Sequence, residues 1–278
     1  MKYFRVSFEI SLKCNKNCTY CRSHANLPFP PQNKVEQAIE NIFLLNKKNI
    51  NFYFLGGEPT IYPYFFNILE KIYSYRNLNE VLIQSNLSRS YSWFKKLINK
   101  FPKIRIAASY HNHQVYNFDD FLQKLLLLKE FEVLEGCDFM LEYENPNKVK
   151  ECLEKMISKG ITPNVRLIEY NSVIKNKLQE VMLLTSYAKY TPLIDKEELD
   201  NTSWKGGLCE AGLRGIVIDY NFNVYPCFSA KYSKDLNSNL GNILTDIKNI
   251  KKSISKKTRC AWDFCSCTPD KQLKKVLD

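Results

Sequence analysis

The stretch YFRVSFEISLKCNKNCTYC, residues 3–21, joins a short apolar run to a loop that carries three cysteines. The run is rich in aromatic and β-branched residues, which predicts a β-strand. Cys14, Cys18 and Cys21 follow the run at spacings of four and three. The loop at the end of the first strand therefore holds three thiols within reach of one another.

Similar runs recur along the first 190 residues, at NFYFLG, EVLIQS, KIRIAAS, CDFMLEY and NVRLIEY. Each run, the opening one included, is followed by a stretch with helical periodicity, which predicts six helices, over residues 33–48, 64–76, 90–100, 117–130, 146–159 and 174–189. Strands that alternate with helices indicate an α/β fold with a parallel sheet, because parallel strands need a crossover between them. Six units predict a partial (β/α)6 TIM-like barrel, with its functional loops at the C-terminal ends of the strands.

The rhythm stops near residue 195. The remaining residues hold five of the ten cysteines and a hairpin-like segment, GIVIDYNFNVYP. We therefore predict two domains, a barrel over residues 1–195 and a small C-terminal domain over residues 196–278. A chain of 278 residues is long enough for both.

Composition narrows the class of protein. The chain begins without a signal peptide and has no apolar stretch long enough to span a membrane, so we expect a cytoplasmic protein with no membrane partner. In a reducing compartment ten cysteines favour metal binding over disulfides. The net charge of +11 is compatible with nucleic-acid binding. However, the densest lysine run, residues 246–257, keeps its isoleucines on one helical stripe, which indicates a solvated helix face instead.

The ends of the first two predicted strands carry complementary chemistry. Three closely spaced thiolates can hold three irons of a 4Fe-4S cube and leave the fourth iron open, whereas a structural zinc site is normally closed by a fourth ligand. The second strand ends in Gly56, Gly57, Glu58 and Pro59. Exposed backbone carbonyls and a carboxylate together make a receptor for an ammonium group. A zinc site or a purely structural cysteine site remains the alternative.

These two motifs resemble those of the radical S-adenosylmethionine (SAM) superfamily. The features that carry the resemblance are the C-x3-C-x-aromatic-C loop, with Tyr20 as the aromatic residue, and the GGEP sequence at residues 56–59. The resemblance implies that the three cysteines hold a 4Fe-4S cluster and that its open iron binds SAM. It also implies that Gly56, Gly57 and Glu58 orient the SAM ammonium, and that reductive cleavage yields a 5′-deoxyadenosyl radical.

Later strand ends supply further candidates. Ser85 and Asn86 match positions where members of that family often carry Thr-Asn, and Ser109 matches a serine that often meets the ribose of SAM. Ordinary strand-end and capping chemistry is the alternative for all three. His111 departs from the family pattern. It is our candidate catalytic residue, because a histidine can take a proton near neutral pH. An exposed loop histidine without a chemical role is the alternative.

The C-terminal cysteines resemble those of a twitch domain, the shorter relative of the SPASM domain, which holds one auxiliary 4Fe-4S cluster. Cys209 and Cys227 flank the predicted hairpin, and Cys260, Cys265 and Cys267 follow a predicted helix. Five cysteines for four irons leave one spare, and we favour Cys260 with one of Cys265 and Cys267. Zinc is the alternative, since four thiolates suit it as well.

The sequence therefore predicts a radical SAM enzyme with two 4Fe-4S clusters. We expect it to abstract hydrogen from a small molecule and to oxidise a sugar-like or cyclitol-like alcohol, with flavodoxin or ferredoxin as the reductant. Cys14 comes so early that we expect no leader-binding domain before it, although a short peptide substrate stays open. An epimerase, a peptide maturase and a non-catalytic metal-binding protein are the alternatives.

Overall fold

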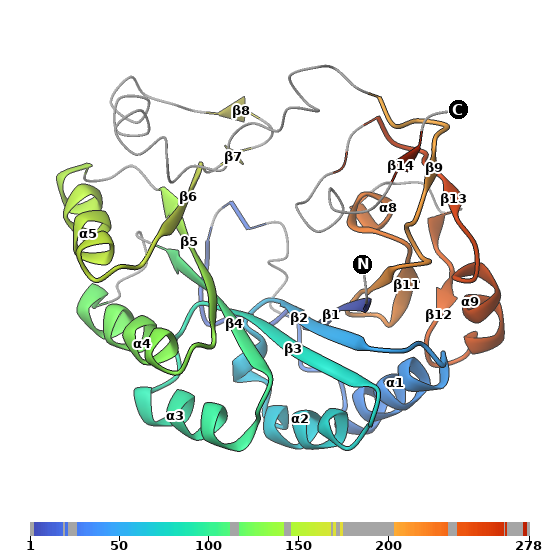
Figure 1. Cartoon of the computed structure of the whole chain (residues 1–278), viewed down its shortest axis with the longest axis horizontal. Helices are drawn as coiled ribbons and strands as arrows, with labels where there is room; N and C mark the ends of the chain where they lie inside the picture. Colours follow the sequence, from blue (N-terminus) through green and yellow to red (C-terminus); the bar gives the residue numbers. More distant parts are fainter. Residues whose placement is uncertain are drawn as a thin grey trace.

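The computed structural model describes residues 3–18, 20–21, 27–111, 117–141, 146–167, 169–170, 173–174, 203–232, 238–263, 265 and 275–276. Its main feature is a nine-stranded sheet in the order β12-β11-β10-β1-β2-β3-β4-β5-β6 (Figure 1). The strands are β1 (Phe4–Ser11), β2 (Ile50–Gly56), β3 (Leu78–Ser85), β4 (Ile104–His111), β5 (Leu134–Leu141), β6 (Pro163–Leu167), β10 (Gly215–Ile218), β11 (Asn223–Tyr225) and β12 (Gly241–Asn242).

Strands β1 to β6 run parallel and in sequence order, so that the sheet curves as an open barrel. The helices that follow the strands cover the outer, convex side of this sheet (Figure 1). They are α1 (Gln32–Leu44), α2 (Phe65–Tyr73), α3 (Tyr91–Lys100), α4 (Phe118–Glu130) and α5 (Pro146–Ser158), and the 3₁₀ turn η1 (Pro59–Ile61) directly follows β2. Buried apolar side chains between strands and helices form one continuous core. The α/β prediction of a partial TIM-like barrel is confirmed.

The C-terminal part of the chain extends this sheet. β10 pairs with β1 in parallel, and β11 turns back against β10 as the predicted hairpin. Helix α9 (Ile247–Ser253) buries Ile250 and the following Ile254, which confirms the apolar stripe within the lysine run. The short helix α8 (Phe228–Tyr232) follows β11, while β9 (Leu208–Cys209), β13 (Thr258–Arg259) and β14 (Lys275–Val276) form a separate small sheet.

Two predictions fall partly outside the described residues. The domain boundary near residue 195 lies between residues 175 and 202, which the structure does not describe, and it stays a prediction. A helix was expected over residues 174–189, but residue 174 belongs to a short hairpin of β7 (Glu169–Tyr170) and β8 (Val173–Ile174). The rest of that range is outside the described residues.

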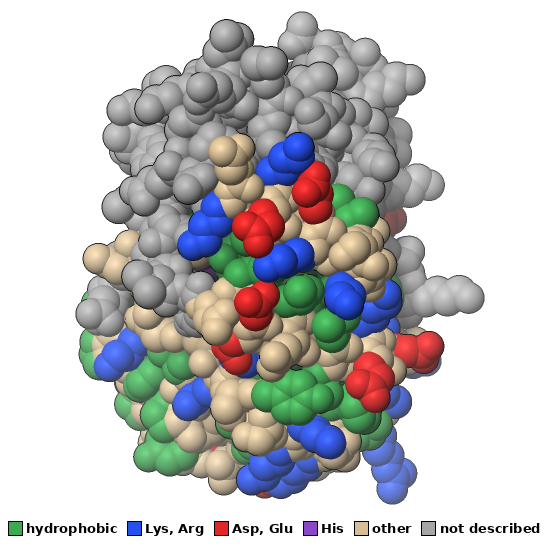
Figure 2. Space-filling model, turned by 90° about the vertical axis from the view of Figure 1, so that its left-hand side faces the viewer, with side chains coloured by type: hydrophobic (Ala, Val, Ile, Leu, Met, Phe, Trp, Pro, Cys, Tyr) green, Lys and Arg blue, Asp and Glu red, His purple; other side chains and the backbone are tan. Residues whose placement is uncertain are grey.

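Charges of both signs are mixed on the face shown in Figure 2. On α5, Lys150 pairs with Glu154, and Lys155 pairs with Glu151 and with Asp119 of α4. Lysines and carboxylates therefore alternate on the exposed surface of α5 and α4. Within the described residues, none of the helices has the length and apolar character needed to cross a membrane.

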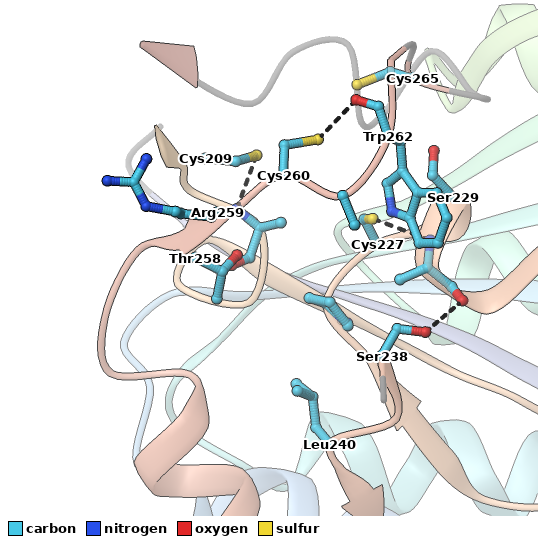
Figure 3. Close-up of a pocket in the computed structure, with 14 residues that line it drawn as sticks. Cys209, Cys227, Ser229, Ser238, Leu240, Thr258, Arg259, Cys260, Trp262 and Cys265 are labelled. Atoms are coloured by element: carbon cyan, nitrogen blue, oxygen red, sulfur yellow. Dashed lines mark hydrogen bonds between the residues drawn. The ribbon is translucent and has the colours of Figure 1, made fainter. Parts of the chain in front are cut away.

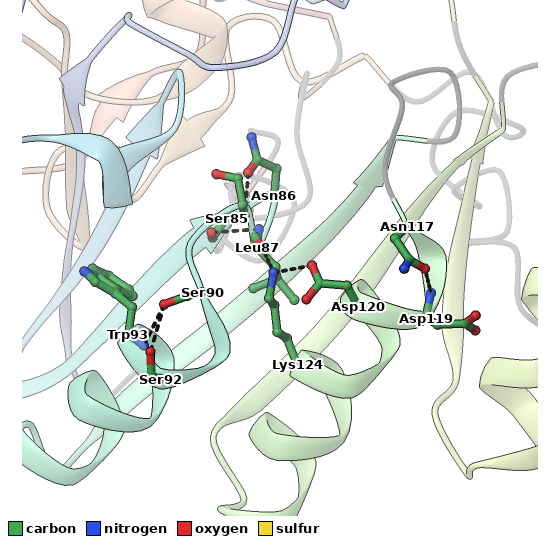
Figure 4. A network of polar contacts seen from close by, with 11 residues as sticks. Ser85, Asn86, Leu87, Ser90, Ser92, Trp93, Asn117, Asp119, Asp120 and Lys124 are labelled. Atoms are coloured by element: carbon green, nitrogen blue, oxygen red, sulfur yellow. Dashed lines mark hydrogen bonds and ion pairs between the residues drawn. The ribbon is translucent and has the colours of Figure 1, made fainter.

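A buried lysine supports the loop after β3. Lys124 of α4 is 3% exposed, and its ammonium donates to the Leu87 carbonyl at 3.0 Å and to Asp120 Oδ2 at 2.6 Å (Figure 4). Leu87 has a φ of 54°, a left-handed conformation that a leucine rarely adopts. The lysine therefore fixes a strained turn immediately after Ser85 and Asn86.

We predict that Lys124→Met lowers the free energy of unfolding by about 1–3 kcal/mol, because it leaves the Leu87 carbonyl without its charged donor. Chemical denaturation of the two proteins measures this difference. The matched control is Lys100→Met, which removes an exposed ion pair with Glu70 and should cost about 0–1 kcal/mol. Equal effects of the two substitutions would contradict the role given to Lys124.

Candidate functional site

A cavity of about 580 Å³ opens at the C-terminal ends of the barrel strands. Its described lining includes most of the residues that the sequence singled out: Cys14, Cys18, Cys21, Gly56, Gly57, Glu58, Ser85, Asn86, Ser109 and His111. Tyr20 and Pro59 are not among the described lining residues, although both adjoin ones that are. The barrel thus brings the motifs of four different strand ends to one space.

Gly56 and Gly57 pack tightly against the backbone of the cysteine loop, which is the segment of residues 12–21 that follows β1. Gly57 N donates to Ser11 O at 2.7 Å, and Glu58 N donates to Lys13 O at 3.0 Å. A Cβ on Gly56 would run into Ser11 O, and one on Gly57 would lie 2.9 Å from the Leu12 carbonyl carbon and closer still to Lys13. Because β-carbons do not approach backbone atoms so closely, both positions require glycine. The sequence argument gave these glycines a ligand role, and the structure adds this packing role.

The Glu58 carboxylate is buried and joins two strand ends. Its Oε1 accepts from Thr60 Oγ1 at 2.6 Å, Thr60 N at 3.2 Å and Ser85 Oγ at 2.9 Å, while Oε2 accepts from Asn86 N at 2.6 Å. Burial raises the Glu58 pKa, and these donors oppose the shift. Oε1 is saturated, whereas Oε2 can accept one more donor, so Oε2 is the atom available to a ligand in the cavity.

Asn86 links this carboxylate to the cysteine loop. Its Nδ2 lies 3.0 Å from Asn15 Oδ1 and 3.9 Å from Cys14 Sγ. Ser85 Oγ, besides donating to Glu58, accepts from Leu87 N at 3.1 Å. Ser109 is 8% exposed and lines the cavity one strand farther along. Ser85 and Asn86 therefore connect the Glu58 carboxylate to the turn at Leu87 and to the cysteine loop, in addition to any contact with a ligand.

His111 is at the end of β4, beside the cysteine loop. Its Nδ1 lies 2.7 Å from Tyr20 Oη and 3.6 Å from Cys18 Sγ, and the two rings stack with an interplanar angle of 17°. From the sequence, His111 is predicted to take a proton from the substrate. In the structure His111 lines the cavity and its Nδ1 faces the cysteine loop, and the catalytic role stays a prediction.

Sequence reasoning missed several polar residues of the cavity wall. Glu9, Tyr53, Gln84 and Asp138 line it from four different strands, and Lys16 lines it from the cysteine loop. Glu9 is 3% exposed and forms an ion pair with Lys231 of α8. The signal was present in the alternation of the strands, where every second side chain of a barrel points inward and these inward positions are polar.

A second cavity, of about 210 Å³, is lined by four of the five C-terminal cysteines. Cys209, Cys227, Cys260 and Cys265 surround it together with Trp262 (Figure 3). Cys267 lies outside the described residues. In the described part of the chain, no three His, Cys, Asp or Glu side chains are grouped so that they could hold a single ion.

Comparisons with known proteins agree with this architecture. The model of the radical SAM superfamily matches residues 8–169. This chain belongs to the radical SAM superfamily. Among solved structures it resembles anSMEcpe with bound AdoMet, at 18% identity and a TM-score of 0.61 over 89% of this chain and 80% of that one. It also resembles Streptococcus suis SuiB bound to S-adenosylmethionine, at 15% identity and a TM-score of 0.59 over 91% and 67%. At such identities the likeness concerns the fold. No curated protein sequence matches.

Membership of the radical SAM superfamily implies a 4Fe-4S cluster and SAM, and the cysteine environments fit anionic sulfur. In both cavities a backbone N–H points at a cysteine sulfur two or three residues before it, which stabilises a thiolate. The pairs are Lys16 N with Cys14 Sγ, Ala211 N with Cys209 Sγ and Ala230 N with Cys227 Sγ, each at 3.4 Å. The buried Cys137, by contrast, donates its own proton toward Asp138 O.

Burial makes these thiols depend on a metal for ionisation. It raises the pKa of Cys14 to about 11, and it raises the pKa of Cys18 as well. Without a bound cation both groups stay protonated at neutral pH, and thiolates are the form that binds iron. Lys16 adds a positive charge beside them, although burial lowers its pKa to about 8.

We predict that Gly57→Ala displaces the cysteine loop and removes the cluster that it holds, which is about half of the iron if each cavity binds one cube. Anaerobic iron and sulfide analysis after reconstitution measures the loss. Gly136→Ala is the matched control, since the nearest atom to its added Cβ is an Asn164 side-chain atom 3.8 Å away. Full iron content in Gly57→Ala would show that the glycine contact does not position the loop.

Proposed function

We propose that this protein is a radical SAM enzyme that oxidises an alcohol group of a small polar substrate and passes one electron to a second 4Fe-4S cluster. The single observation that carries the proposal is the position of α8. Phe228 and Tyr232 of this five-residue helix line the cavity of about 580 Å³, called the barrel cavity below. Ser229 and Ala230 line the cavity of about 210 Å³ that Cys209, Cys227, Cys260 and Cys265 surround, called the thiol cavity below. A substrate in the barrel would thus be one short helix away from the second site.

In the barrel cavity, Cys14, Cys18 and Cys21 would ligate the cluster whose open iron binds SAM. The backbone carbonyls at Gly56 and Gly57 and the free position on Glu58 Oε2 would receive the SAM ammonium. Ser109 would meet the ribose, and Asn86 would keep the cysteine loop in place through Asn15. When bound, the cluster and SAM supply the radical that abstracts hydrogen from the substrate.

In the thiol cavity, Cys209, Cys227, Cys260 and Cys265 would ligate the second cluster, leaving Cys267 as the spare. Support comes from the N–H groups aimed at two of these sulfurs and from a cavity volume that exceeds the needs of one ion. None of the nine cysteines that the structure describes forms a disulfide, which suits a reducing compartment, and we propose the cytoplasm.

The proposed groups account for the hydrogen atom, the proton and the electron that an alcohol loses when it is oxidised to a carbonyl. The substrate carbon would lose one hydrogen atom to the radical that SAM supplies, the hydroxyl would lose its proton to a base, and a cluster held by the C-terminal cysteines would accept the remaining electron, which would leave a carbonyl. For the base we propose Glu9 in preference to His111. Glu9 lines the cavity, as do Phe228 and Tyr232 of α8, and burial raises its pKa while Lys231 opposes the shift. His111 has its Nδ1 engaged by the cysteine loop.

The chemistry of the cavity wall supports a small polar substrate. Beyond the candidate SAM and cluster residues, the wall offers Glu9, Tyr53, Gln84 and Asp138, which can bind hydroxyl or ammonium groups. Peptide modification is the second candidate, because anSMEcpe has been solved with a Kp18Cys peptide and SuiB with the precursor peptide SuiA.

We predict that protein reconstituted without oxygen holds about eight irons and eight sulfides as two cubes. With a reductant such as flavodoxin, ferredoxin or dithionite it should cleave SAM slowly to 5′-deoxyadenosine. Replacing Cys14, Cys18 and Cys21 by alanine should abolish cleavage and leave about four irons. Replacing Cys209, Cys227 and Cys260 should leave about four irons and the basal cleavage. Stoichiometric zinc without sulfide would refute the proposal.

We also predict that the product is two hydrogens lighter than the substrate. A panel of sugars and aminocyclitols can be screened for faster 5′-deoxyadenosine formation, and the accepted compound analysed by mass spectrometry in deuterated water. An epimerase would instead return a hydrogen atom from a thiol, for which Cys267 is the spare. Its product would gain one deuterium with no loss of mass, and that result would replace oxidation by epimerisation.

A further inference from the structure

Three polar groups meet at the edge of the cysteine loop. His111 Nδ1 is 2.7 Å from Tyr20 Oη and 3.6 Å from Cys18 Sγ, and the Tyr20 hydroxyl also forms a hydrogen bond with the Cys18 side chain. Cys18 is 6% exposed, so water contributes little to the solvation of its sulfur. The hydrogen bonds from Tyr20 and His111 are therefore a large part of the polar environment of this atom.

The fold determines the direction of the histidine. The preceding residue, Tyr110, is 2% exposed and packs against Phe118, Phe121 and Phe139 on the helix side of the sheet. Successive side chains of a strand point to opposite faces, so His111 must point into the cavity. The stacked ring of Tyr20 then keeps the imidazole against the loop. This contact follows from β4 packing and does not require a bound substrate.

We propose that Tyr20 and His111 form a hydrogen-bond relay to Cys18 that sets the reduction potential of the cluster at the SAM site. The proposal rests on the proposed function in one respect, that Cys18 is a cluster ligand. His111 acts here through Tyr20 as a positioning residue and takes no proton from the substrate.

The direction of the relay follows from the sulfur. A ligating thiolate can only accept hydrogen bonds, so the Tyr20 hydroxyl donates to Cys18 Sγ. The Tyr20 oxygen is then an acceptor, and the neutral imidazole carries its proton on Nδ1 and donates it to Tyr20 Oη. Reduction adds a negative charge to the cluster, and donors to its sulfurs stabilise that charge. The relay therefore makes the cluster easier to reduce.

The test measures the midpoint potential of the reconstituted holoenzyme by EPR-monitored redox titration, using the signal that added SAM perturbs. Tyr20→Phe removes the donor to sulfur, and His111→Leu removes the group that orients it. Each substitution should lower the equilibrium constant for reduction of the cluster about tenfold. For a one-electron couple this makes the midpoint potential about 59 mV more negative. The double variant should shift the potential by less than the sum of the two single shifts, because the shorter contact of His111 is the one with Tyr20 and the two residues are coupled. His111→Asn, which can keep an N–H near the Nδ1 position, should restore the wild-type potential.

The control is Tyr73→Phe, which removes a buried hydroxyl from α2, outside the cavity lining, and should leave the potential unchanged. Unshifted potentials in both Tyr20→Phe and His111→Leu would overturn the proposal. An equal shift in His111→Asn would also overturn it, since ring packing and not the N–H would then be responsible. Loss of the cluster from Tyr20→Phe would assign the hydroxyl to cluster assembly and likewise reject tuning. A wild-type protein with no SAM-responsive EPR signal would instead refute the proposed function.

Discussion

Parallel pairing of β1 on both of its edges is the constraint on which the site depends. The strand bonds to β2 on one side and to β10 on the other, and all eight of its residues are buried. Its C-terminal end is therefore fixed before the cysteine loop begins. The loop then lies directly over the glycines that end β2, with backbone hydrogen bonds that leave no space for a side chain. Without these contacts nothing in the loop after β1 would orient its three thiols toward one space.

The inward face of the barrel combines burial with charge. Glu58 and Glu9 are 1% and 3% exposed, and burying a carboxylate is costly unless hydrogen bonds or a counter-charge compensate. Glu58 has four donors from two strand ends, whereas Glu9 has the ammonium of Lys231. Each carboxylate thereby ties together segments that are distant in sequence. Glu9 and Glu58, which a ligand in the cavity would contact, thus also fix the relative positions of the segments that form the cavity wall.

Local patterns predicted the barrel because each strand and helix has its own periodicity, and because parallel strands bring their C-terminal ends to one edge. Cys14, Gly57 and Glu58 could therefore be expected to lie together. The ion pair of Glu9 could not, since Lys231 is 222 residues farther along the chain and no local pattern connects them. His111 was recognised as unusual, but its contact with Cys18 depends on how β4 packs. The same limit applies to β10, whose hairpin was predicted but whose pairing with β1 was not.

The pairing of β10 with β1 also bears on how this protein can be divided. A chain cut before Gly215 would turn β1 from a central strand into an edge strand, with the backbone groups from Arg5 to Phe8 open to another molecule. Long apolar edges of this kind recruit further strands and lead to aggregation. The C-terminal segment thus completes the barrel sheet as well as contributing cysteines, so any replacement for it must also supply a strand that pairs with β1.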